Sequence, residues 1–270
     1  MNTEESISAD GRGRMPEATE SDFYQEVAES LPNPEFIFLN YGYAHASTGA
    51  SDWIDPRDHC YKLHLNLVHH LLSGVALAGR RVLEVGSGRG GNCYFLSRYT
   101  KANQIYGIDL CEANVQFCRN VHRLPNLSFL RGDAQQLPLR SETLDVVLNL
   151  ESSHCYPHFE RFLAEVYRVL KPGGIFCYAD LWFLEFLKLD WDRRKRALDA
   201  APFFLVSEED ISEPVFQALG SREGLAQTIR AMANETNRRF VEETVDRLNV
   251  VRLTLGLGQF SYRLWRFRKP

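Results

Sequence analysis

Short apolar runs that are almost uninterrupted by polar residues recur through the middle of the chain. Three of them cover residues 81–85, 104–108 and 144–150. Continuous apolar character over so short a length is typical of strands buried on both faces of a parallel sheet. Residues 92–99 and 112–123, which lie between these runs, carry apolar side chains at helical spacing. This alternation of strand and helix predicts an α/β fold.

The later part of the chain completes the sheet. Further strands are expected at residues 126–131, 175–179 and 202–206, and further helices at residues 159–170 and 181–198. Residues 258–269 alternate apolar and polar side chains, as an antiparallel strand would. We therefore predict a Rossmann-like, doubly wound, seven-stranded sheet whose last strand is antiparallel. Helical stretches at residues 213–219 and 222–248 are expected to form a helical lid.

The N-terminal quarter of the chain differs in sequence pattern from the residues predicted to form the sheet. Residues 1–20 contain few large apolar side chains and are expected to be disordered. Residues 21–79 should form an N-terminal helical cover, and residues 80–270 the main domain, with the lid inserted at about 213–250. The chain lacks a signal-peptide pattern and an apolar run of roughly 18 residues, which a bilayer span needs. We expect a cytoplasmic protein with no stable membrane association.

The composition of the chain limits the classes of molecule that it is expected to bind. The 270 residues carry a net charge of −4 with a pI of about 6.1, which disfavours nucleic acid and favours a small-molecule substrate. The six cysteines show no C-x-x-C or zinc-like spacing, so we expect free thiols and no metal site. The composition is also compatible with a homodimer.

A glycine-rich turn follows the first apolar run. Gly86, Gly88 and Gly90 separate that run from a predicted helix, and Asp109 closes the next strand 23 residues after Gly86. Glycines at such positions let the backbone turn sharply and let a ligand approach the main chain, and the acid is placed to reach a ribose diol. This spacing predicts a nucleoside-binding βαβ unit.

Two further acids decide which nucleoside is bound. Glu84 lies inside the first strand, two residues before Gly86, where it would repel a pyrophosphate but suit the cationic methionine end of S-adenosylmethionine (SAM). Gly132-Asp133-Ala134 closes the third strand. Together with the glycines, these residues resemble class I SAM-dependent methyltransferases.

That resemblance implies a role for each matching residue. It places the methionine portion of SAM on Gly86, Ser87, Gly88 and Gly90, and the ribose on Asp109 beside Leu110. Asp133 and Ala134 would meet the adenine, and Asn149 would also contact the cofactor. S-adenosylhomocysteine (SAH) would be the product. A similar aromatic turn in many small-molecule methyltransferases makes Tyr43 the candidate cover, although Tyr41 and Tyr43 could equally anchor the N-terminal arm.

The loop after the fourth strand is where chemistry is expected, because open parallel sheets bind ligands beyond their carboxyl ends. It contains His154, Tyr156 and His158. Histidine can remove a hydroxyl proton near neutral pH, so we assign His154 as the general base, against a purely structural role. Tyr156 and His158, with His64 from the helix at residues 57–73, are expected to contact substrate.

One family resembles the chain over longer stretches of sequence. The run LNLESSHCYPHFERFLAEVYRVLKPGG, with EFIFLNYGYA, HLNLVHH, RGDAQQLP and FSYRLWRF, closely resembles the phthiotriolone/phenolphthiotriolone dimycocerosates methyltransferases. The similarity covers most of residues 35–180 and the last strand, whereas residues 181–257 match poorly. The resemblance implies O-methylation of a secondary hydroxyl on a long polyketide-derived lipid.

Three alternatives stay open at this point. The same scaffold serves C-methyltransferases that act on an activated carbon of a natural product. It also serves catalytically silent SAM-binding subunits. A nicotinamide-dependent dehydrogenase ranks last, because no Tyr-x-x-x-Lys pair stands in a position to serve one. The segment Asn149-Leu150-Glu151-Ser152 differs from the Asp/Asn-Pro-Pro-aromatic element of nucleobase and amide N-methyltransferases, which disfavours that chemistry.

Overall fold

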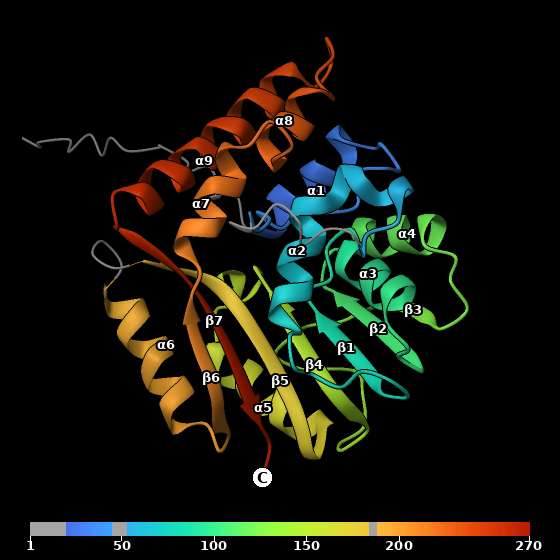
Figure 1. Ribbon diagram of the computed structural model, residues 1–270, viewed down its shortest axis with the longest axis vertical. Coiled ribbons are helices and arrows are strands. Elements are labelled where there is room, and N and C mark those ends of the chain that lie inside the picture. The colour runs from blue at the N-terminus through green and yellow to red at the C-terminus, as the bar shows by residue number, and fades with distance from the viewer. Residues whose placement is uncertain (1–19, 45–52, 184–187) are drawn as a thin grey trace, which may run out of the picture.

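The computed structural model describes residues 20–44, 53–183 and 188–270. Within these residues a seven-stranded sheet forms the centre of the molecule, in the order β3-β2-β1-β4-β5-β7-β6 (Figure 1). Its strands are β1 (Arg81–Val85), β2 (Gln104–Asp109), β3 (Leu127–Arg131), β4 (Leu144–Leu150), β5 (Leu170–Phe183), β6 (Phe204–Asp210) and β7 (Phe260–Arg268). The predicted disorder of residues 1–20 lies outside the described part of the chain, except for Glu20.

The strand directions confirm the predicted topology. Strands β3, β2, β1, β4 and β5 run parallel, whereas β7 is antiparallel to both of its neighbours, β5 and β6. The strand order reverses between β1 and β4, because β2 and β3 lie to one side of this pair and β5 to the other. The carboxyl ends of β1 and β4 therefore open the crevice in which doubly wound sheets bind their ligands.

Helices cover both faces of the sheet, which explains the uninterrupted apolar runs. Val82 of β1 packs into a cluster with α2 (Lys62–Leu71), α3 (Gly91–Tyr99) and α4 (Glu112–Val121). Its neighbour Leu83 points to the other face, where α5 (Phe159–Val169) and α6 (Lys188–Ala200) pack. Both side chains are fully buried.

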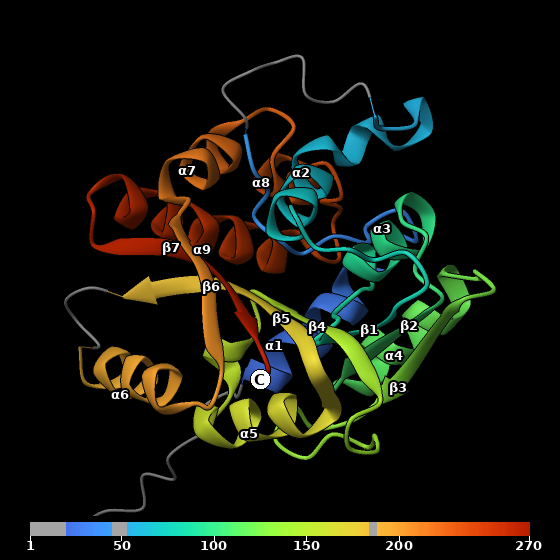
Figure 2. The ribbon, with the colours of Figure 1, turned by 60° about the horizontal axis from the view of Figure 1, so that its bottom comes forward.

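A further layer lies beyond the carboxyl ends of the parallel strands. It consists of α1 (Glu20–Ser30), α7 (Ser212–Gly220), α8 (Leu225–Arg230) and α9 (Arg238–Gly256) (Figures 1 and 2). Helix α1 contacts α4, and α9 contacts α7, α8 and β7. Across the described residues no helix combines the length and apolar character that a bilayer crossing requires.

The region after β4 departs from the predicted boundaries. A strand at residues 175–179 and a helix at 181–198 were expected, but β5 continues to Phe183 and α6 begins at Lys188. Leu181 and Trp182 pair with β7, and Trp182 is almost fully buried, so sheet pairing overrides their helical spacing. Strand β5 also begins earlier than expected, at Leu170, and residues 171–174 coincide with a register shift of β5 against β4. Strand β6 begins and ends later than the predicted 202–206.

Two predicted helices are broken. The stretch 222–248 divides into α8 and α9, because Asn237 closes a turn between them: its side chain donates to Met232 O and Ser30 O and accepts from the Asn234 N–H. The stretch 57–73 begins as a 3-10 helix, η1 (Pro56–Tyr61), and continues as α2. Residues 36–39 form no strand. They run extended beside the glycine turn, where Gly91 N–H donates to Ile37 O.

Candidate cofactor and acceptor site

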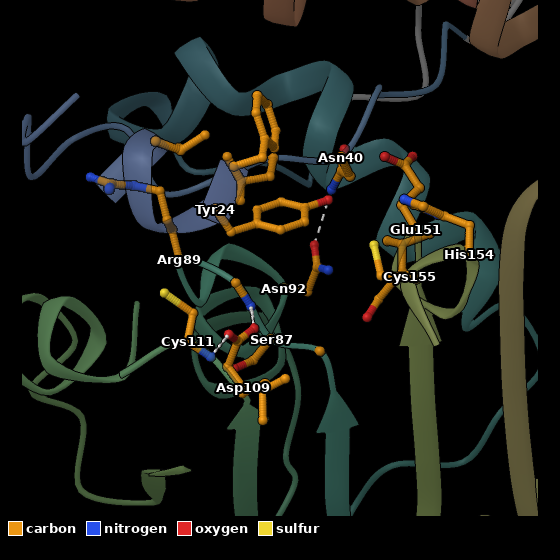
Figure 3. A pocket seen from close by; sticks show the side chains of 18 of the residues that line it. Tyr24, Asn40, Ser87, Arg89, Asn92, Asp109, Cys111, Glu151, His154 and Cys155 are labelled. Atoms are coloured by element: carbon orange, nitrogen blue, oxygen red, sulfur yellow. Dashed lines mark hydrogen bonds between the residues drawn. The ribbon is translucent and has the colours of Figure 1, made fainter. Parts of the chain in front are cut away.

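A cavity of about 710 Å³ lies at the carboxyl ends of β1, β2 and β4 (Figure 3). Its floor is the glycine turn, with Asp109 on one side and the loop after β4 on the other. Apolar side chains from α1, the residue directly after it, α8 and α9 line its far wall: Phe23, Val27, Leu31, Leu225, Ile229, Leu248 and Val251. One end of the cavity is thus polar and the other is largely apolar.

The glycine turn packs directly against the loop after β4. Gly86, Gly88 and Gly90 all have positive φ, at 73°, 50° and 79°. A Cβ on Gly86 would lie 1.8 Å from Ser152 Oγ and 2.8 Å from Tyr156 Oη, so only glycine fits there. Gly86 and Gly88 line the cavity, whereas Gly90 caps helix α3. Ser87 lines it too, and its Oγ is buried without a partner among the described residues.

Asp109 joins the glycine turn to β2. Its Oδ2 accepts the Gly88 N–H at 2.7 Å and its Oδ1 accepts the Cys111 N–H at 2.9 Å (Figure 3). Burial raises the pKa of Asp109, while these two backbone donors act in the opposite direction. Leu110, Asp133 and Ala134 line the cavity on the same side. The structure therefore brings together the residues predicted for the ribose and adenine.

Glu84 lies behind the glycine turn and does not line the cavity. The side chain is fully buried, where Oε1 accepts from Asn92 Nδ2 at 2.6 Å and Oε2 from Cys93 Sγ at 2.9 Å. Burial raises its pKa to about 7. Asn92, which lines the cavity, separates Glu84 from any ligand, so Glu84 acts on a ligand only through the first turn of α3.

The tyrosines that line the cavity are not the one predicted as the cover. Tyr43 does not line the cavity: its ring stacks on His70, with centroids 4.5 Å apart, and its N–H donates to Leu63 O. Tyr41 lines the cavity instead, as does Tyr24, whose ring extends from α1 into it (Figure 3). The aromatic turn was recognised from the sequence, but the direction of each side chain depends on how the segment that carries Tyr41 and Tyr43 packs on α2.

Two of the three residues predicted to contact substrate also lie outside the cavity lining. His64 is buried behind the arm, stacked on Phe38, and its Nδ1 lies 2.8 Å from Asn40 O. Burial lowers its pKa to about 4, so the ring is neutral. His158 is exposed and lies 3.9 Å from Glu160. Helical and loop spacing placed both histidines near the site but could not show which way they face.

The third predicted contact, Tyr156, lines the cavity. Its hydroxyl lies 2.5 Å from Ser152 Oγ and accepts from Asn149 Nδ2 at 3.1 Å. Asn149 itself is fully buried, and the same amide donates to Val85 O at 2.9 Å. Asn149 therefore ties β4 to β1 and orients Tyr156 without reaching the cavity.

His154 lines the cavity and is paired with a buried acid. Its Nδ1 lies 2.8 Å from Asp180 Oδ1, and its N–H donates to Asp180 Oδ2 at 3.0 Å. Ser153 Oγ donates to the same Oδ2, and Arg194 donates to His154 O. Burial alone would lower the pKa of His154, but the Asp180 carboxylate outweighs it and holds this pKa well above its usual range.

Glu151 is a site residue that sequence reasoning did not assign. It lines the cavity, and its backbone has a φ of 52°, which is rare for a residue with a side chain. The carboxyl oxygens accept the Tyr41 N–H at 3.0 and 3.1 Å, and Oε1 accepts the Tyr262 hydroxyl at 2.7 Å. Burial raises its pKa to about 8. Its position directly after β4 was the available signal.

The described residues contain no group of three or more His, Cys, Asp or Glu side chains that could hold a metal ion. The ionisable side chains on the cavity wall are partly buried and hydrogen-bonded to other residues. His154 with Asp180 and the carboxyl of Glu151 stand on the same wall of the cavity, beside the glycine turn (Figure 3).

Comparison with solved structures supports the architecture. The [4+2]-cyclase SpnF superposes with a TM-score of 0.68 at 20% identity, covering 93% of this chain and 96% of SpnF. The geranyl diphosphate C-methyltransferase of Streptomyces coelicolor A3(2) superposes with a TM-score of 0.65 at 15% identity, covering 94% and 100%. At these identities the likeness shows the shared Rossmann-like fold.

Comparison with curated sequences shows the family. A family model described as a methyltransferase domain matches residues 83–178. The phthiotriol/phenolphthiotriol dimycocerosates methyltransferase of Mycobacterium tuberculosis is 37% identical, over 92% of this chain and 90% of that protein. The fatty-acid O-methyltransferase of Mycolicibacterium smegmatis is 32% identical, over 92% and 88%. The chain therefore belongs to the SAM-dependent methyltransferase family that includes the phthiotriol/phenolphthiotriol dimycocerosates methyltransferases.

Proposed function

We propose that the protein transfers the methyl group of SAM to a hydroxyl oxygen of a lipid or other natural product, releasing SAH. The observation that carries this proposal is the pairing of His154 with buried Asp180 on the wall of the cofactor cavity. The relatives named above, one acting on phthiotriols and one named a fatty-acid O-methyltransferase, support a lipid acceptor and methyl transfer to oxygen.

The residues present fit the cofactor. When bound, SAM supplies an electrophilic methyl group on a positively charged sulfur. Gly86 and Gly88 line the cavity with main chain alone, and the unpartnered Ser87 hydroxyl can bond the methionine portion of SAM. Asp109 would hold the ribose, with Leu110 beside it, and Asp133 and Ala134 the adenine. The roles of Gly90 and Asn149 become indirect, through α3 and Tyr156.

His154 is the proposed base. Because its Nδ1 faces Asp180, Nε2 is the ring nitrogen left for the acceptor. In the neutral imidazole this atom takes the hydroxyl proton as the new carbon–oxygen bond forms. Asp180 fixes the tautomer and stabilises the imidazolium that results, and Arg194 holds the loop. Tyr156 lies next to this position and would orient the acceptor.

The apolar end of the cavity suits a long chain. Val27 comes from α1, Leu31 follows that helix directly, and Leu225, Ile229 and Leu248 come from α8 and α9. Burying alkyl groups there is favourable by about 0.8 kcal/mol for each methylene. We infer that residues 21–79 act as a cover and α7–α9 as the lid that selects the acceptor. The exposed residues Phe204, Leu205 and Val206 of edge strand β6 offer a surface for a homodimer.

A C-methyltransferase is the second candidate, and Glu151 is the observation that favours it. A half-buried carboxyl on the cavity wall could remove a proton from the carbon that receives the methyl group. The two candidates differ in the atom that receives the methyl group, which makes them separable by product analysis.

The test is an acceptor panel with methyl-labelled SAM. Long-chain secondary alcohols, the matching ketones and the matching fatty acids would be incubated with the protein, and the products analysed by mass spectrometry and NMR. We expect methyl ethers of the alcohols. Methylation of ketones at carbon would select the second candidate, and methyl esters alone would place the activity on carboxylates. SAM binding without turnover of any acceptor would indicate a silent subunit.

A further inference from the structure

We propose that Glu151 is a switchable counter-charge for the cofactor: its carboxyl is protonated in the free protein, ionises when the sulfonium of SAM enters the cavity, and regains a proton once the cofactor is neutral SAH. This role concerns the cofactor and holds for any acceptor. It would make Glu151 the residue that distinguishes SAM from SAH.

The backbone at Glu151 is held in a disfavoured conformation that serves the cavity. A φ of 52° places a glutamate in the left-handed region, and such outliers persist where the surroundings impose them. The Glu151 N–H donates to Ala179 O on β5 at 2.9 Å, so the residue stays joined to the sheet although its φ is not that of a strand. The resulting turn directs the carboxyl from the end of β4 into the cavity (Figure 3).

The surroundings of the carboxyl favour the protonated form in the free protein. The groups that face it are the Tyr41 N–H from the arm, the Tyr262 hydroxyl from β7, Asp180 from β5 and His154 from η2 (Ser153–Cys155). Burial is the largest influence and Asp180 adds to it, so the pKa rises to about 8 despite two donors and the imidazole. The carboxyl is then mostly protonated at pH 7.

The position of Glu151 brings it to the methionine end of the cofactor. Ser152, the next residue, has its Oγ 1.8 Å from where a Gly86 Cβ would lie, so the loop and the glycine turn are in contact. A cation held on that turn would stabilise the ionised carboxyl. SAM and SAH share the same amino and carboxylate groups, and they differ in charge only at sulfur.

Over one turnover, Glu151 releases and takes up the same number of protons. SAM binding converts the Glu151 carboxylic acid to the carboxylate and releases one proton to solvent. Methyl transfer then converts the sulfonium to a thioether, and the acceptor proton leaves through the base. Because the cation is gone, the Glu151 carboxylate takes up one proton from solvent. SAH therefore loses a favourable contact and dissociates more readily than SAM.

The coupling between SAM binding and proton release sets the direction in which the affinity for SAM changes with pH. Since SAM binding releases a proton, the affinity for SAM relative to SAH rises with pH by up to about tenfold per unit below pH 8. Above pH 8 the free protein is already ionised, so this ratio levels off. For Glu151→Gln the ratio should not change with pH through this range.

Calorimetric titration in buffers of different ionisation enthalpy measures the released protons directly. At pH 7 we expect the wild type to release close to one more proton with SAM than with SAH. Sinefungin, whose amine is a cation in place of the sulfonium, should behave as SAM does. Glu151→Gln keeps an acceptor for Tyr41 and Tyr262, so it should fold, bind both ligands and lose the difference.

Two further variants make the assignment specific. Glu84→Gln changes the other buried carboxyl near the glycine turn, which lies off the cavity, and should retain the SAM–SAH difference. Tyr262→Phe removes a donor to the carboxylate and so raises the pKa of Glu151 in the free protein. Release of a proton on SAM binding should therefore persist to higher pH. A difference that persists in Glu151→Gln and disappears in His154→Asn would assign the proton to the imidazole and overturn the proposal.

Discussion

His154 Nδ1 lies 2.8 Å from Oδ1 of Asp180, a carboxylate that is fully buried within β5. The second carboxylate oxygen accepts the His154 N–H and the Ser153 hydroxyl, so the acid is held on both sides. Burial alone would raise the pKa of Asp180, but the positive charge of His154 lowers it overall. When His154 loses a proton, the neutral ring keeps its Nδ1–H toward Asp180 and leaves Nε2 for the acceptor.

Asp180→Asn should move the pH–rate profile to lower pH. The proposed base acts only when His154 is neutral, so the wild-type rate rises with pH as His154 loses its proton. Removing the carboxylate lowers the pKa of His154 and shifts this rise toward acid. The maximal rate should also fall, because an amide no longer fixes the tautomer. An unshifted profile would show that another group titrates.

Gly86→Ala should be far more harmful than Gly173→Ala. Both glycines have a φ near +75°, but a Cβ on Gly86 would clash with Ser152, whereas nothing lies within 4 Å of one on Gly173. We expect about 1 kcal/mol of destabilisation at Gly173 and about 3 kcal/mol at Gly86. Urea unfolding measures both, and SAM binding should fail only in Gly86→Ala. Equal losses would show that the clash is relieved.

Asp109→Ala should lower the affinity for SAM by about 10- to 100-fold, the loss expected for hydrogen bonds to a charged group. Asp145→Ala is the matched control: Asp145 also binds a backbone N–H, that of Arg81, but lies outside the cavity. It should lower the unfolding free energy and leave SAM affinity intact. Calorimetric titration measures the affinities, and an equal loss in both variants would refute a direct role for Asp109.

Tyr24→Ala should weaken SAM binding about three- to tenfold, through loss of ring contact with the cofactor. Tyr43→Ala should not, because Tyr43 stacks on His70 away from the cavity. Fluorescence or calorimetric titration of the two variants decides between them. Weaker binding in Tyr43→Ala alone would restore the cover role that the sequence suggested for it.

The sheet could be predicted from sequence because its central strands are buried on both faces. Strands β1 and β4 have the predicted limits, since every residue in them is packed and the apolar run itself marks the element. Glycines with positive φ and the acid that ends β2 were equally visible, because each has a local cause. The lid helices were less predictable: their break at Asn237 depends on a contact with Ser30, far away in the sequence.

Side-chain direction explains what sequence could not supply at the site. His64 and Tyr43 belong to segments that approach the cavity, yet both face other segments, His64 toward Phe38 and Tyr43 toward His70. Glu151 faces the cavity only because its backbone turns into the left-handed region, for which a glutamate gives no signal. Asp180 pairs with His154 through the register of β5 against β4, which is a property of the assembled sheet.

The central claim is that His154 accepts the acceptor's proton while other residues hold SAM. His154→Asn tests it most directly, because the asparagine amide can still donate to Asp180 while the basic Nε2 is gone. The measurement is the single-turnover rate at saturating SAM, with SAM affinity determined in parallel. We predict a rate about 10²- to 10⁴-fold lower with unchanged affinity for SAM. An unchanged rate would contradict the assignment of His154 as the base.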